Sequence, residues 1–255
     1  MGRLVTLLGR SSASSILIPL SVSDVAAGGS IGSAATTVDI YSAFLINQTT
    51  AGNALTLATP TQTSLMREVN VSNVGSAGFF MYGRYIRPGA SMLYVYVPSV
   101  GWRATVSSAQ VLSQSAVQVT APADTSENTL ASFAGPGGAI GSNGALLVRA
   151  SFSFTASAHA KTLRIKLGTT ELARFGPGST SASLDVIWYV TNRNSEASQI
   201  GMPQAGSGAG ATANAYFTGT ENTANAWTLS ITGHKGSGGE TLALEAYSIE
   251  LLRFD

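Results

Sequence analysis

Apolar and polar residues alternate along several short runs of the chain. In residues 161–167, Leu163, Ile165 and Leu167 take every second place between charged or polar residues. This period of two is typical of a strand with one buried face and one solvent-facing face. Gly168 and Thr169 follow, and then comes a second run at 171–175. The pattern therefore predicts a β-hairpin.

Similar runs recur along most of the chain. Strands are expected at 38–46, 54–57, 68–72, 79–86, 92–97, 129–133, 145–154, 162–167, 171–175, 182–192, 227–232 and 241–252, with a weaker one near 214–217. Turn signals separate them, and Pro88-Gly89 suits a type II turn because proline fixes φ and glycine accepts positive φ. Short strands with a turn roughly every eight to twelve residues are typical of all-β sandwiches and barrels.

Breaks in this pattern predict three parts. Residues 1–30 form an N-terminal arm with two apolar patches, made of Leu4, Leu7 and Leu8 and of Ile16, Leu17 and Ile18. The arm packs either on its own domain or on a neighbouring subunit. A small β-sandwich or barrel domain is expected at 31–120, and an antiparallel jelly-roll sandwich at 121–255. One short helix could lie within 107–115, and the glycine-rich residues 201–215 predict a long surface loop.

Composition limits the classes of function. Charged residues make up 11% of the chain, and 14 basic against 13 acidic residues give a formal net charge of +1. A nucleic-acid-binding protein should show a basic excess, so no nucleic acid is expected as a partner. No apolar run reaches the roughly 18 residues of a membrane span. The absence of cysteine excludes disulfides and thiolate metal sites.

No pattern predicts catalysis. Residues 28–32 match the Gly-x-Ser-x-Gly elbow of serine hydrolases, but no helix is expected after them, as that motif requires. His159 and His234 have no partner at a metal-ligand spacing and are expected in exposed turns. The thirteen carboxylates form no evident pair for cleaving a glycan. We therefore expect no enzyme, no catalytic residue, no metal and no cofactor.

Aromatic residues gather in the first domain. Tyr94, Tyr96 and Trp102 lie near several arginines, a mixture that can bind glycans or proteins. Residues 92–97 are apolar at both alternating sets of positions, so this strand is expected between the domain core and a subunit interface. Arg193 follows the apolar run 186–190 and is expected to anchor a turn or to reach a neighbouring subunit.

Two stretches carry a resemblance to a known class. Residues 35–50, with Val69-Asn-Val-Ser-Asn-Val-Gly75 and Phe80-Met-Tyr-Gly83, resemble a β-module in structural proteins of tailed bacteriophages. Residues 141–149, 161–168, 192–195 and 198–201 resemble a jelly-roll module of phage virion proteins. Such modules occur in capsid decoration (cement) proteins, head fibres and tail fibres. The resemblance implies a virion role without a catalytic motif.

The resemblance implies a non-enzymatic structural protein on the virion surface, assembled in the host cytoplasm. A capsid decoration or head-fibre protein is the first hypothesis, with the major capsid protein or another virion protein as partner. Self-association is also expected, with a homotrimer favoured over a dimer. The alternative is a tail-fibre or receptor-binding protein that recognises a host surface glycan through an aromatic groove or residues 201–215. A glycan-cleaving enzyme is a third and weaker hypothesis.

Overall fold

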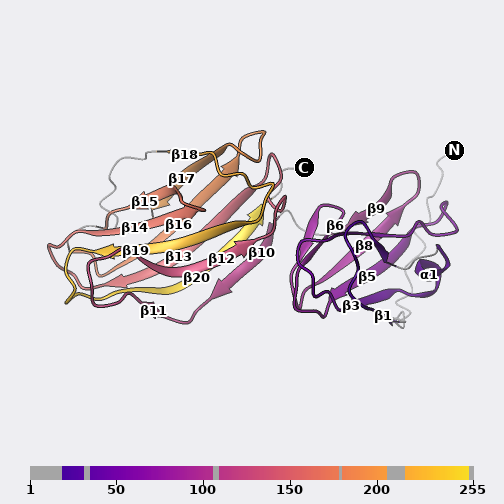
Figure 1. Cartoon of the computed structure of the whole chain (residues 1–255), viewed down its shortest axis with the longest axis horizontal. Helices are drawn as coiled ribbons and strands as arrows, with labels where there is room; N and C mark the ends of the chain where they lie inside the picture. Colours follow the sequence, from indigo (N-terminus) through magenta and orange to yellow (C-terminus); the bar gives the residue numbers. More distant parts are fainter. Residues whose placement is uncertain (1–18, 32–34, 106–108, 178–179, 206–215, 253–255) are drawn as a thin grey trace, which may run out of the picture. The chain divides into compact units, whose positions relative to one another are not determined.

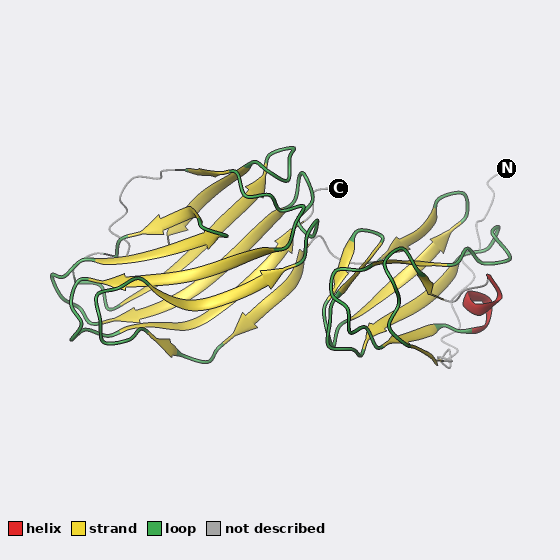
Figure 2. Cartoon of the chain, in the orientation of Figure 1, coloured by secondary structure: helices red, strands yellow, loops and turns green. Residues whose placement is uncertain are grey.

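The computed structural model describes residues 19–31, 35–105, 109–177, 180–205 and 216–252. Strands predominate in these ranges, and α1 (Ala35–Ile40) is the single helix assigned there (Figure 2). The chain separates into two compact units that divide near residue 105. The expected all-β fold is thus confirmed.

The N-terminal unit contains two sheets (Figure 1). One holds β1 (Pro19–Val22), β3 (Ala43–Ile46), β5 (Arg67–Asn73), β8 (Ser91–Val97) and β9 (Gly101–Ala104), and the other holds β2 (Ser30–Ile31), β4 (Ala54–Leu57), β6 (Phe79–Met81) and β7 (Arg84–Ile86). Successive strands from β1 to β6 alternate between the sheets, and each pairs in parallel with the strand two places before it. The chain therefore coils like a short solenoid, and β5, β8 and β9 then pair antiparallel.

Buried polar groups hold the corners of this coil together. Gln48 is fully buried, and its amide group accepts from the Val25 N–H and donates to the Val25 carbonyl, both at 3.0 Å. Gly75 lies on the next turn of the coil, where a Cβ would come within 2.1 Å of the Gln48 carbonyl oxygen. Only glycine fits there without displacing backbone, so the close stacking of the corners depends on it.

Two sequence expectations for this unit were wrong. The expected strand 38–46 is strand only from Ala43, because α1 precedes it and buries Val38 in the core. The expected strand 79–86 is the hairpin β6–β7, which turns at Tyr82 and Gly83 with φ of 49° and 72°. Two consecutive positive φ values are what a type I′ turn requires. Residues 19–30 of the expected arm pack on their own domain, which was one of the two alternatives, and contribute β1 and the first residue of β2.

The C-terminal unit is a two-layered sandwich (Figure 1). The large sheet has the order β10 (Ala109–Ser115), β20 (Leu242–Leu252), β13 (Ala145–Phe154), β16 (Ser183–Asn192), β17 (Gln199–Ala205) and β18 (Phe217–Gly219), with β11 (Val119–Thr120) also on β20. The small sheet has the order β12 (Asn128–Gly135), β19 (Trp227–Lys235), β14 (Lys161–Leu167) and β15 (Thr170–Phe175). If β17 and β18 are treated as an inserted hairpin, this strand order is that of a jelly roll.

The hairpin that opened the sequence analysis is β14–β15. Leu163, Ile165 and Leu167 are all fully buried, as the period of two predicts. Gly168 has φ of 57° at the first position of the two-residue turn, as a type II′ turn requires. Trp188 of the large sheet packs against Phe175 of the small one with ring centroids 5.3 Å apart. The core of this unit therefore lies between its two sheets.

The expected domain boundary at 120 lies too late in the chain. Both β10 and β11 pair with β20, so residues 109–120 belong to the C-terminal unit, and 109–115 is strand where a helix was considered. The expected loop 201–215 begins as β17, although Gly201 and Pro203 weaken its strand pattern. A Cβ at Gly201 would lie 1.7 Å from the Leu172 carbonyl oxygen, so this strand needs glycine in order to pack over β15.

Candidate functional site

The aromatic residues expected at an interface lie in the core of the N-terminal unit. Tyr94 is fully buried, and Tyr96 and Trp102 are each 6% exposed, with ring centroids 5.4 Å apart. Trp102 Nε1 donates to the Ala58 carbonyl at 2.9 Å. These side chains therefore form no surface groove for a glycan. Leu93, which points the other way from β8, is 38% exposed and is the apolar residue that this strand offers to solvent.

Of the remaining candidate interface residues, the structure describes Arg193 but not those of the N-terminal arm. Leu4, Leu7, Leu8, Ile16, Leu17 and Ile18 lie outside the described residues. Arg193 is exposed directly after β16, and its backbone N–H donates to the Ser198 carbonyl at 2.8 Å. The Arg193 backbone thus closes a turn, and its side chain is available to a neighbouring molecule.

Charged residues on the small sheet pair with one another. Glu127 accepts from Lys166 at 2.8 Å, and Glu171 accepts from Arg164 at 3.0 Å and from Arg174 at 2.7 Å. The charges on this face therefore compensate one another across neighbouring strands.

A second charged cluster closes one end of the C-terminal unit. Glu240 is 8% exposed and accepts from Ser157 and from His159 Nδ1, while Lys161 Nζ lies 3.6 Å from its other oxygen. Lys235, 2% exposed, donates to the Glu240 carbonyl at 2.7 Å. The hydrogen bond from Ser157 is the main cause that lowers the pKa of Glu240. The Ser157 hydroxyl also accepts from Lys161 Nζ at 3.1 Å, so these side chains form one connected hydrogen-bond network.

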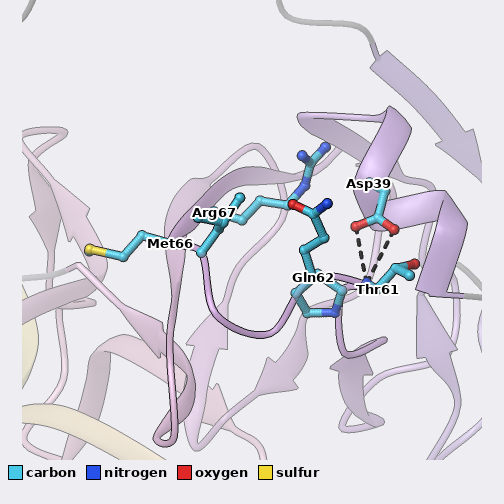
Figure 3. Close-up of a pocket in the computed structure, with 7 residues that line it drawn as sticks. Asp39, Thr61, Gln62, Met66 and Arg67 are labelled. Carbon is cyan, nitrogen blue, oxygen red and sulfur yellow. Dashed lines mark hydrogen bonds between the residues drawn. The ribbon is translucent and has the colours of Figure 1, made fainter.

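A pocket of about 430 Å³ opens on the surface of the N-terminal unit (Figure 3). Its walls come from α1 and from the segment that leads into β5, and they comprise Asp39, Pro60, Thr61, Gln62, Leu65, Met66 and Arg67. The Asp39 carboxylate oxygens accept from the Thr61 N–H at 3.2 and 3.3 Å, which fixes the carboxylate relative to the segment. Figure 3 shows the polar ends of Gln62 and Arg67 on the same side as Asp39, with Met66 pointing away.

Sequence reasoning did not single out this pocket. Asp39 and Arg67 lie 28 positions apart and belong to no motif, and only the coiling of the chain brings them together. The signal available in the sequence was the adjacent pair Leu65-Met66, two large apolar residues in a segment otherwise rich in threonine and glutamine. Their side chains are 57% and 66% exposed. Apolar side chains exposed beside a polar pocket are a feature of binding surfaces.

The motifs considered from the sequence lie in strands. Ser30 of the Gly-x-Ser-x-Gly match lies in the two-residue strand β2, and α1 follows at Ala35 where no helix was expected. His234 lies within β19 instead of an exposed turn. No group of three or more His, Asp or Glu side chains that could hold a metal occurs among the described residues. In that same part of the chain, no helix has the length and hydropathy to cross a membrane.

The sequence matches no protein family and no curated protein. Solved structures with some likeness include lectin I from Ulex europaeus in complex with the methyl glycoside of α-L-fucose (6% identity, 43% of this chain, 72% of the other, TM-score 0.25). They also include the CBM2 module of the evolved Dit of Lactobacillus casei BL23 phage J-1 (12% identity, 49% and 69%, TM-score 0.25) and infectious bursal disease virus Gt strain (11% identity, 66% and 44%, TM-score 0.28). The neighbours thus include a phage module and a virus particle, but at these TM-scores they carry no argument about function.

Proposed function

We propose that the chain is a non-enzymatic structural protein of a bacteriophage virion, and that it serves as a capsid decoration or head-fibre protein. The observation that carries the proposal is the strand order of the C-terminal unit. Residues 141–201, whose sequence resembles phage virion jelly rolls, form β13 to β17 of a sandwich with jelly-roll order. Sequence resemblance and topology thus agree over the same segment.

The role of such a protein is mechanical. It attaches to the shell through the apolar patches of the N-terminal segment and stabilises the shell by burying surface against its neighbours. Permanent interfaces of this kind commonly bury more than about 2,000 Å² and are rich in apolar contacts. Low charge and a surface rich in Ser, Thr, Ala and Gly suit close contact between subunits, and a homotrimer is the proposed form in solution.

The strand positions show that a shorter deletion than residues 1–30 is needed to test this proposal. Removing residues 1–30 would also remove β1 and the first of the two residues of β2, which pair with β3 and β4. A deletion of residues 1–18 removes all six arm residues of the proposed interface and leaves every described strand intact. Its effect on attachment can therefore be separated from an effect on folding.

The test measures binding of the purified chain to virions that lack it, followed by cosedimentation and imaging of the particles. The full chain should bind at regular positions on the shell, and the chain without residues 1–18 should keep its thermal unfolding transition but fail to bind. The matched control is Asp185→Asn, which changes an exposed residue of β16 in the other unit and should bind normally. Binding that survives the deletion would show that the N-terminal segment is not the anchor.

A further inference from the structure

The pocket of the N-terminal unit has polar groups of both signs. Asp39 supplies a carboxylate, and Arg67 supplies a guanidinium from the first residue of β5. The guanidinium carries several N–H donors in one plane, which can bond to an acceptor oxygen that enters the pocket.

The Asp39 carboxylate can accept more hydrogen bonds than it does in this structure. Among the described residues, both Asp39 oxygens share one donor, the Thr61 N–H, at distances near the upper end for such bonds. An ionised carboxylate can accept about four hydrogen bonds, so most of its capacity remains open to a ligand. Gln62, exposed beside it, can donate and accept. The pocket thus suits a ligand that carries several donors and acceptors close together.

The charged groups and the exposed apolar side chains of the pocket limit the class of ligand that fits it. An anion would meet Asp39 and a cation would meet Arg67, so neither fits the site without repulsion. Leu65 and Met66 are more than half exposed at the rim and offer an apolar surface beside the polar groups. A sugar ring is uncharged, carries adjacent hydroxyl groups that both donate and accept, and has an apolar C–H face. The volume of about 430 Å³ lies in the usual range for small-molecule sites.

We propose that this pocket binds a neutral sugar unit of a surface glycan, with Asp39 accepting from its hydroxyl groups and Arg67 donating to one of its oxygens. Gln62 bridges further hydroxyl groups, and Leu65 contacts the C–H face. This activity is independent of attachment to the shell, since it uses none of the proposed arm residues. The chain would then link the particle to a carbohydrate-bearing surface.

The test incubates the labelled full-length chain with an array of neutral and sialylated oligosaccharides. The wild-type chain should bind at least one neutral glycan. Asp39→Asn keeps an oxygen that can accept from the Thr61 N–H but loses the charge, so it should weaken binding about tenfold or more. Arg67→Lys keeps the positive charge but removes the planar set of guanidinium donors, and it should also weaken binding. The matched control is Asp185→Asn, an exposed aspartate on β16, which should bind like wild type.

Three outcomes would overturn the proposal: binding to no neutral glycan, equal binding by wild type and Asp39→Asn, or displacement of the bound glycan by a mixture of free amino acids. The last result would identify a zwitterion as the preferred ligand. Circular dichroism and melting temperature confirm that each variant remains folded. Failure here leaves the attachment experiment unaffected, because that experiment measures binding to particles by another segment.

Discussion

Replacing Tyr94 tests whether the aromatic strand β8 serves the core or a subunit contact. Its side chain is fully buried, its hydroxyl donates to the Met81 carbonyl at 3.1 Å, and its ring centroid lies 5.7 Å from that of Tyr82. Tyr94→Phe removes the hydroxyl and leaves the Met81 carbonyl without this donor, which should cost about 1–2 kcal/mol. Tyr94→Ala also removes the ring from the core and should cost about 3–5 kcal/mol.

Calorimetry of the purified chain can measure these losses in the transition of the N-terminal unit. For a unit of this size, about 1 kcal/mol corresponds to about 4–8 °C in melting temperature. The matched control is Leu93→Ala on the opposite face of the same strand, where the side chain is 38% exposed. That substitution should cost at most about 1 kcal/mol, because much of the leucine is already in water.

The two possible roles of β8 predict different patterns. A core role predicts a lower melting temperature for Tyr94→Ala at every protein concentration. An interface role predicts an unchanged melting temperature for the isolated chain and a smaller species in sedimentation. If Tyr94→Ala melted like wild type while Leu93→Ala unfolded early, the assignment of these two faces would be wrong.

Two further predictions concern the C-terminal unit. Gly201→Ala should lower the urea midpoint more than Gly141→Ala, because a Cβ at residue 201 would collide with the Leu172 carbonyl. A Cβ at residue 141 has open space, and the positive φ there should destabilise the alanine variant by about 1–2 kcal/mol. Equal midpoints would contradict the packing of β17 over β15. The fold lowers the pKa of Glu240 from 4.5, chiefly through the hydrogen bond from Ser157. The ionised Glu240 therefore stabilises the folded state above about pH 4.5, and this contribution is lost as the pH falls through the lowered pKa. The free energy of unfolding, measured in urea, should therefore fall less between about pH 6 and about pH 3 for Glu240→Gln than for wild type. An identical fall in both proteins would exclude this contribution.

The sequence pattern predicted the C-terminal unit better than the N-terminal one. Strands such as β14 and β16 have one face on the core, so their side chains alternate and the period of two is visible. β17 was missed since Gly201 and Pro203 resemble loop residues. Glycine is needed at residue 201 because a Cβ there would collide with the Leu172 carbonyl, and the local sequence pattern does not predict that contact.

The coiling of the N-terminal unit could not be deduced from the sequence for a different reason. Parallel pairing of β1 with β3 and of β3 with β5 leaves the same alternation in each strand as antiparallel pairing would. The expected strand at 38–46 failed because the chain crosses between sheets there, and α1 makes that crossing while it buries Val38. Long-range pairing thus overrides local strand propensity.

The candidate pocket follows from the same coiling, and the contrast with the jelly roll explains why it stands out. On the small sheet, Lys166 and Arg164 each lie within 3.0 Å of a carboxylate, so their charges are already compensated. On the N-terminal unit, Asp39 and Arg67 line one pocket, yet within the described residues the Asp39 oxygens accept from a single backbone N–H. Charges that only stabilise a fold are expected to pair with each other. Charges that share a pocket and still have hydrogen-bonding capacity are the better candidates for binding a ligand.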